Sequence, residues 1–399
     1  MKKSLLALAA MGAFVGAAQA QSSVSVYGVM DIGVIQSTDA VAAATTGVQT
    51  TTKQLNTGYG KGGLASSRLG FRGTEDVGGG TAVGFVLEYG LKDIGIGGTG
   101  GAQASSTSAD ASTTTANASG MVDPRQSYVS LSNKGMGQIR LGRQAQSIHA
   151  VIIDGSVGGG NNIAGAIYSG GENSGLNNAS IRPELVWINR AVTYISPNFN
   201  GITFEAQTGN QTISSGTTST VPDSAATDVG ASLRYAAGPA KLGIGYSVVQ
   251  LNASPTTGYN KLEFLAVSGS YDFKVVQAFA LYTSSKKENG AGANLGSLGA
   301  MEIGLKAPVV KNVNVWASGF KGSRSSNSTT AVAVTQNFTT YTALGEANVK
   351  GYQFGAQYVL SKRSSLYAIG GSQSIDGKNS SNGINNRSSA AIVGINHTF

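Results

Sequence analysis

Few residues of this 399-residue chain could carry covalent or metal chemistry. It has no cysteine, which excludes disulfides and thiolate chemistry. Its two histidines, His149 and His397, lie far apart in the sequence and make no plausible zinc site. Ser147, His149 and Asp154 are near one another and leave a hydrolase open as an alternative, although no motif surrounds them. Residues 158–160 are glycines, but no Lys-Ser/Thr follows, so they form no phosphate loop. We expect no catalysis and no cofactor.

Arginines placed among alternating apolar residues are more informative. In residues 65–74, Leu69 and Phe71 share one face of a predicted strand. Arg68 and Arg72 share the other face. If the strand crosses a membrane, an arginine facing lipid at mid-depth costs roughly 2–4 kcal/mol. Arg68 and Arg72 are therefore expected to face a water-filled lumen.

A second pair of arginines is less clearly placed. With Ile139 and Leu141 facing lipid, strict alternation turns Arg140 inward and Arg143 outward. Gly142 lies between them and could end the strand. In that case the alternation would no longer determine the side on which Arg143 lies. Both arginines therefore remain candidates for the lumen.

The two ends of the chain predict where the protein resides. Lys2 and Lys3 precede an apolar run over residues 5–18 and an Ala-Gln-Ala cleavage site, so residues 1–20 are expected to be a secretory signal. The alternative, an anchor helix, needs about twenty apolar residues. At the other end, residues 391–399 alternate to the terminal Phe399. This ending resembles the C-terminal assembly signal of bacterial outer-membrane barrels, which the barrel-assembly machinery reads.

Composition favours a barrel made of membrane-crossing strands. Charged residues are only 12%, mean hydropathy is −0.01 and 57 residues are glycine. After residue 20, no stretch of eighteen apolar residues predicts a membrane helix. The net charge is +8, but no run of Lys and Arg exceeds two after the signal, which argues against a nucleic-acid partner.

Strand-like segments recur from residues 24–37 to the end, joined alternately by short turns and long polar loops. We count sixteen strands, seven short turns and eight long loops over residues 21–399, all in one domain. Sixteen strands of about twelve residues use about 190 residues, which leaves a similar number for connections. The sequence therefore predicts an all-β fold, a 16-stranded antiparallel transmembrane β-barrel with short turns in the periplasm. The alternative, a soluble β-sandwich or β-solenoid, does not explain why residues 391–399 alternate up to the terminal Phe399.

Six segments, taken in order, resemble the general porins of Gram-negative bacteria, particularly those of β-proteobacteria. They are residues 26–31 (VYGVMD), 67–80 (SRLGFRGTEDVGGG), 125–131 (RQSYVSL), 141–144 (LGRQ), 194–199 (YISPNF) and 393–399 (VGINHTF). The resemblance implies a homotrimer of pores, in each of which an inward-folded third loop narrows the lumen. It also implies that Arg68, Arg125 and Arg143 form a cluster on the barrel wall.

The third long segment, residues 144–183, corresponds to that loop. Its apolar residues 150–153 and its glycines favour packing inside the barrel. Asp154 and Glu172 are its only acids, and we expect them to oppose the arginines. Because so few acids oppose several arginines, the predicted pore favours anions.

We therefore predict an outer-membrane channel through which small hydrophilic solutes and ions, anions in particular, diffuse passively. Outer-membrane lipid and lipopolysaccharide would surround it. The alternatives are a substrate-specific channel for phosphate, an organic acid or a sugar, and an adhesin-like surface barrel.

Overall fold

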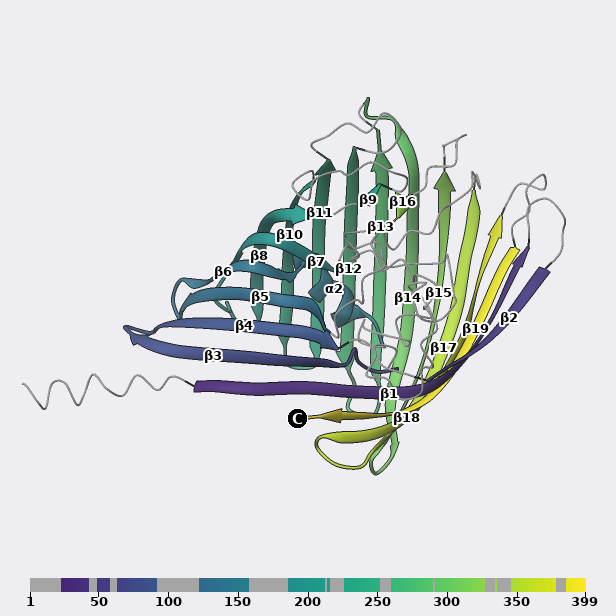
Figure 1. The fold of residues 1–399 in the computed structure, drawn as a ribbon, viewed down its shortest axis with the longest axis horizontal. Coiled ribbons are helices and arrows are strands. Elements are labelled where there is room, and N and C mark those ends of the chain that lie inside the picture. Colours follow the sequence, from purple (N-terminus) through teal and green to yellow (C-terminus); the bar gives the residue numbers. More distant parts are fainter. Residues whose placement is uncertain are drawn as a thin grey trace, which may run out of the picture.

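In the computed structural model, a sheet curves into a barrel whose strands are steeply inclined to one another (Figure 1). The structure describes residues 23–42, 49–57, 63–91, 122–157, 186–211, 214–215, 226–251, 260–289, 291–326, 334–335, 346–377 and 385–399. The predicted signal peptide, residues 1–20, lies outside the described residues, as do Glu172 and residues 158–160. No helix among the described residues is long and apolar enough to cross a membrane.

Antiparallel strands make up nearly all of the described chain. They are β1 (Ser23–Ala42), β2 (Gln49–Thr57), β3 (Arg68–Gly78), β4 (Thr81–Leu91), β5 (Val122–Asn133), β6 (Gly137–Ala145), β7 (Trp187–Ile195), β8 (Ile202–Gln211), β9 (Ser214–Ser215), β10 (Ala226–Ala237), β11 (Ala240–Leu251), β12 (Lys261–Asp272), β13 (Gln277–Glu288), β14 (Asn294–Val310), β15 (Val313–Ser326), β16 (Val334–Thr335), β17 (Ala347–Val359), β18 (Ser364–Gly377) and β19 (Asn385–Thr398).

The sheet closes because β1 pairs with the last strand. Val29–Ala40 of β1 pair with Thr398–Arg387 of β19, and β8 pairs with β10 on the far side. The main sheet of the described chain holds 17 strands. One of them, β2, pairs with the end of β1 while β3 pairs with its start, so β2 and β3 share one place in the barrel. Sixteen places remain, which confirms the predicted 16-stranded antiparallel barrel.

Several strand ends differ from the sequence-based prediction. The alternation of residues 24–37 predicts a strand that ends at residue 37 and a loop that follows to residue 63, but β1 extends to Ala42 and forms a hairpin with β2. This polar segment lacks an apolar alternation, so backbone pairing beside β1 could not be anticipated. Similarly, β3 begins at Arg68 rather than residue 65 and continues beyond residue 74 to Gly78.

Alternation sorts side chains between the two faces of the wall. On β17, Tyr352, Phe354 and Tyr358 are exposed on the outer face, while Val349 and Gln353 are buried on the inner face. The last strand follows the same rule, since Val393 and Ile395 are exposed and Ile392 is buried. This is the apolar outer band that a membrane barrel needs.

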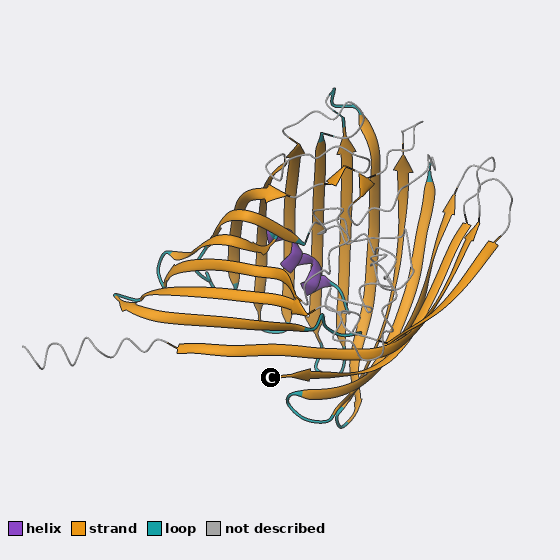
Figure 2. Cartoon of the chain, viewed as in Figure 1, coloured by secondary structure: helices purple, strands orange, loops and turns teal. Residues whose placement is uncertain are grey.

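A short helix, α2 (Ser147–Gly155), forms the start of the third long segment. Figure 2 draws it in purple among the strands, and its contacts are with β8 and β10–β13. Ile148, Val151 and Ile152 lie on one face, at the spacing of a helix, and all three are fully buried. The sequence predicted inward packing of residues 150–153 but not a helix.

Small residues on the inner wall make room for this helix. A Cβ added at Gly243 would lie 3.1 Å from the Val151 side chain, and one at Gly245 would lie 3.1 Å from Ile148. Polar contacts hold the N-terminal end of the helix. The Ser147 backbone N–H donates to Gln207 Oε1 at 3.0 Å. The described start of the third loop is thus fixed against β10–β13.

The closing seam is held by a buried carboxylate. Asp31 of β1 is 0% exposed. Its Oδ1 accepts from Tyr367 Oη at 2.5 Å, and its Oδ2 accepts from Asn396 Nδ2 at 2.9 Å and from the Ala65 N–H at 2.8 Å. The Leu64 N–H donates to the same oxygen at 3.1 Å. One side chain therefore joins β1, β18, β19 and the segment that leads into β3.

We expect Asp31→Ala to weaken the seam. Hydrogen bonds to a charged group contribute about 1.5–3 kcal/mol each, and buried donors would lose their acceptor. The variant should lose roughly 3 kcal/mol of unfolding free energy, seen as a lower urea midpoint in detergent. Asp76→Ala is a matched control, because Asp76 accepts a single exposed bond from the Gly78 N–H. Equal midpoints for both variants would contradict this role of Asp31.

Candidate functional site

An acidic side chain organises the arginines on β3 and β5. Glu88 of β4 is 5% exposed. Its Oε1 accepts from Arg125 Nε at 2.7 Å, and its Oε2 lies 3.6 Å from Arg68 Nε. Tyr27 Oη also donates to Oε2, at 3.1 Å. Arg68 and Arg125, both predicted wall residues, therefore meet at one carboxylate.

The position of Glu88 follows from alternation on β4. Leu87 is exposed and pairs with Phe71 on the outer face, whereas Glu88 pairs with Gly70 on the inner face. Sequence reasoning overlooked Glu88, although the same alternation that turned Arg68 inward applies to it.

An aromatic ring joins the cluster from β7. The guanidinium carbon of Arg125 lies 4.8 Å from the centroid of Trp187, and that of Arg143 lies 5.8 Å from the same centroid. Both distances are within the range of a cation–π interaction. Arg143 Nε also donates to the Pro124 carbonyl at 3.0 Å, and Arg143 Nη1 donates to Asn189. Trp187 thus brings two arginines together.

Irregular pairing is what permits this arrangement. The β6–β7 register shifts between Gly142 and Gln144, and Gly142 has φ of 135°, a conformation suited to glycine. The expectation that Gly142 could end the strand is wrong, because β6 continues to Ala145. The register shift is a bulge whose extra residue lies on β7, where Arg190 has a φ of 48°.

Arg72 and Arg140 occupy neighbouring parts of the inner wall. Arg72 Nε donates to Ser25 Oγ at 3.3 Å, and its guanidinium carbon lies 5.1 Å from the Tyr27 ring. Arg140 pairs across β6–β7 with Thr193, which is fully buried. Its guanidinium carbon lies 5.2 Å from the Tyr128 ring.

The loop acid Asp154 has different partners from those expected. Its Oδ1 lies 3.3 Å from Lys241 Nζ and its Oδ2 lies 3.7 Å from Arg234 Nη1. These cations belong to β10 and β11, the wall against which α2 packs. The structure therefore brings Asp154 to Arg234 and Lys241 instead of to the predicted arginines. Arg234 could have been found by alternation, since Leu233 and Tyr235 on either side are exposed.

Positive charge predominates along this arc of the wall. Among the described residues, six cations occupy inner positions on β3–β11: Arg68, Arg72, Arg125, Arg140, Arg234 and Lys241. The carboxylates facing them are Glu88, Glu205, Asp228 and Asp154, and Asp228 is buried under α2. Glu205 interacts electrostatically with both Arg140 and Arg234. No group of three metal-ligating side chains occurs in the described part of the chain.

A closed sixteen-stranded barrel with an apolar outer band and a charged inner wall is a transmembrane β-barrel channel. The model of the Gram-negative porin family matches residues 7–378. The chain is 31% identical to outer membrane porin protein 32 of Delftia acidovorans, over 77% of this chain and 76% of that one. It is 28% identical to an outer membrane porin of Bordetella pertussis over the full length of both. The chain belongs to the family of Gram-negative porins.

Solved structures share the fold. An anion-selective porin from Comamonas acidovorans has a TM-score of 0.66 at 22% identity, over 95% of this chain and 100% of that chain. The OmpF porin of Salmonella typhi has a TM-score of 0.59 at 17% identity, over 94% and 97% of the two chains. The protein is an outer-membrane channel for passive diffusion, as its sequence predicted.

We expect Glu88→Gln to increase the preference of the channel for anions. The change removes one negative charge from the inner wall and leaves Arg68 and Arg125 unneutralised. A charge about 10 Å from a permeating ion changes the energy of that ion by ~1 kcal/mol at intermediate dielectric. This energy corresponds to a change of about five-fold in relative permeability. Reversal potentials in a KCl gradient across a planar bilayer measure this ratio.

Glu75→Gln is the matched control for that variant, because it removes the same charge at a position opposite the exposed Val83, on the outer face. If the two variants change the reversal potential equally, Glu88 does not face the path of the ions.

Proposed function

We propose that this diffusion channel prefers anions and that its arginine wall forms the constriction. The observation that carries the proposal is the convergence of Arg68 and Arg125 on Glu88, the one carboxylate that pairs with them in the described part of the chain, which leaves excess positive charge at one place on the wall. Low-dielectric walls focus the field of such charge onto the aqueous path, which raises the local concentration of anions. The structural relative titled an anion-selective porin supports this preference.

The contacts described above support the proposed lining of the constriction. Arg72 and Arg140 extend the positive wall on either side of the Glu88 cluster, and Arg143 supports Arg125 through Trp187. Asp154, engaged by Arg234 and Lys241, fixes the third loop to the wall. We also propose that Glu172 opposes the arginines. Solutes pass without any covalent step.

We also propose the assembly that the sequence implies. The protein is exported with cleavage after Ala20, is inserted through recognition of the strand that ends at Phe399, and associates as a homotrimer. Two observations support the role of the last strand. Its exposed residues alternate to the very end, and the Phe399 N–H donates to the Gly28 carbonyl at 3.1 Å, which continues the seam with β1.

We expect the double variant Arg68→Gln with Arg125→Gln to shift selectivity toward cations. Loss of two positive charges, each contributing ~1 kcal/mol to the energy of a nearby ion, should lower the ratio of anion to cation permeability by roughly ten-fold or more. Single-channel recording in a planar bilayer gives conductance and reversal potential in one experiment.

Lys134→Gln with Lys311→Gln is the control, since it removes the same charge from two exposed turn residues. Unchanged selectivity in the arginine variant would contradict the proposed constriction. Solute flux that saturates at low concentration in the unaltered protein would instead favour the alternative of a substrate-specific channel.

A further inference from the structure

Two short segments from distant parts of the chain pair with each other at the long-loop end of the barrel. Strand β9 (Ser214–Ser215) follows β8, and strand β16 (Val334–Thr335) follows β15. Val334 pairs with Ser215 and Thr335 with Ser214, in an antiparallel two-stranded sheet that is separate from the wall. Figure 1 labels both strands in the upper part of the view, where the long loops lie. We call this pair of segments the crossbar.

The two segments come from places far apart on the rim. Between β8 and β15, the strands around the wall are β10, β11, β12, β13 and β14. β15 is therefore six places from β8, whereas eight places separate opposite sides of the sixteen-place barrel. With strands about 4.8 Å apart and tilted by about 40°, six places correspond to a chord of roughly 30 Å across the mouth.

Chain length decides which segment reaches across. Ser214 is three residues beyond the end of β8 at Gln211, so β9 lies within about 10 Å of that end. Val334 is eight residues beyond the end of β15 at Ser326, which allows a reach of about 27 Å. Because β16 pairs with β9, it must lie roughly 15–20 Å from the end of β15. β16 is thus held over the mouth rather than above its own strand.

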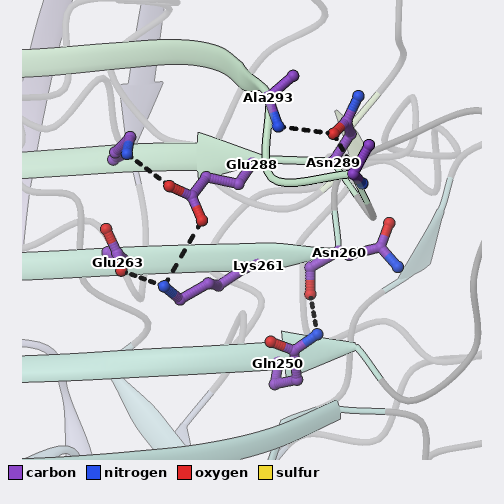
Figure 3. Close-up of polar contacts among 9 residues, drawn as sticks. Gln250, Asn260, Lys261, Glu263, Glu288, Asn289 and Ala293 are labelled. Carbon is purple, nitrogen blue, oxygen red and sulfur yellow. Dashed lines mark hydrogen bonds and ion pairs between the residues drawn. The ribbon is translucent and has the colours of Figure 1, made fainter.

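The arc of wall between the two anchors is firmly held at its loop-side edge. The chain turns from β13 into β14 between Asn289 and Ala293, where Asn289 Oδ1 accepts from the Ala293 N–H at 2.9 Å. Lys261 of β12 contacts Glu263 and lies 3.5 Å from Glu288 Oε2 of β13, as Figure 3 shows. Since the anchors of the crossbar cannot easily move, the passage beside it can change only if the two segments separate.

The crossbar divides the mouth into two unequal parts. The smaller part is bounded by β10–β14, and helix α2 packs against β10–β13 on this side. The larger part is bounded by β17–β19, β1 and β3–β7. It includes the strands that carry Arg68, Arg125 and Arg140. A solute that enters through the larger part therefore meets the arginine side of the lumen.

We propose that the crossbar sets the size limit of the outer entrance and that it opens and closes as the two residue pairs break and re-form. A ladder of two pairs can separate reversibly, because isolated two-stranded sheets are marginally stable in water. While the pairs are formed, larger solutes are excluded and small ions pass on either side. Only the delivery of solutes to the arginine wall rests on the proposed constriction; the size limit does not.

Cysteines placed at one pair of the crossbar test the proposal, since the chain has no cysteine of its own. In Ser215→Cys with Val334→Cys, oxidation should join the two segments within one chain, which protects both thiols from alkylation. Uptake of neutral sugars of increasing length into proteoliposomes then gives the size limit. We expect the limit of the oxidised protein to be at least one hexose unit smaller than that of the reduced protein, and a reductant should restore it.

Ser215→Cys with Lys362→Cys is the control, because Lys362 lies in a short turn at the opposite end of the barrel. Oxidation should leave its size limit unchanged. The reversal potential in a KCl gradient should be the same for the oxidised and reduced crossbar variant, so failure of the proposed anion preference would leave this test intact. Two results would contradict the crossbar: thiols that stay free in the folded variant, and equal size limits before and after cross-linking.

A variant without cysteine keeps the test decisive if the double cysteine variant does not fold. Val334→Pro with Thr335→Pro removes both backbone N–H groups of β16 and prevents its pairing. Sugars near the size limit should then enter at least two-fold faster than through Val334→Ala with Thr335→Ala, which keeps both N–H groups. Equal rates of entry through these two variants would overturn the proposal.

Discussion

The structure depends on the need to satisfy every backbone hydrogen bond of a strand that is surrounded by lipid. An open edge in hydrocarbon would leave a row of N–H and C=O groups without partners, so the sheet must close. Closure occurs where β1 meets β19, and Asp31 secures that seam through Tyr367, Asn396 and the segment before β3. A buried carboxylate is costly unless it is well hydrogen-bonded, and here four donors serve it. These donors all reach Asp31 on the inner face of the barrel, where the wall is polar.

Closure also fixes which side chains can meet inside. Alternation alone sends Arg68, Glu88 and Arg140 to the inner face, but it does not bring Arg125 and Arg143 to a shared ring. Shifts in register do so, one between β4 and β5 beside Glu88 and one between β6 and β7 at Gly142. Bulges of this kind redirect individual side chains while the rest of the ladder continues. The arginine wall is thus a product of irregular pairing within a regular barrel.

This division explains which features could be predicted from the sequence. The strand number, the antiparallel closure and the faces of Arg68, Arg72 and Arg140 follow from alternation, which is a local property. The family followed from short segments such as residues 67–80. The hairpin of β2, the helix α2 and the partners of Asp154 could not be predicted, because they depend on contacts between segments far apart in the chain. Residues 49–57 are polar and show no apolar period, so only their pairing with β1 makes them a strand. Asp154 lies beside Arg234 and Lys241 because helix α2 packs against β10–β13, and no local pattern encodes that choice.

The same chemistry has different consequences on the two faces of the wall. Inside, arginines gather around Glu88 and Trp187, and water screens the charge that remains, so an excess of cations serves to attract mobile anions. Outside, at the edge of the apolar band, screening is weaker and the strands hold Lys321 and Lys350 in direct opposition. Carboxylates stabilise such ammonium groups elsewhere on this face, as in the Lys261–Glu263 and Lys286–Glu288 pairs. Consecutive residues of a strand face opposite sides of the wall. The charge of the lumen and the charge of the membrane-facing surface can therefore change separately, by substitution at inner or at outer positions.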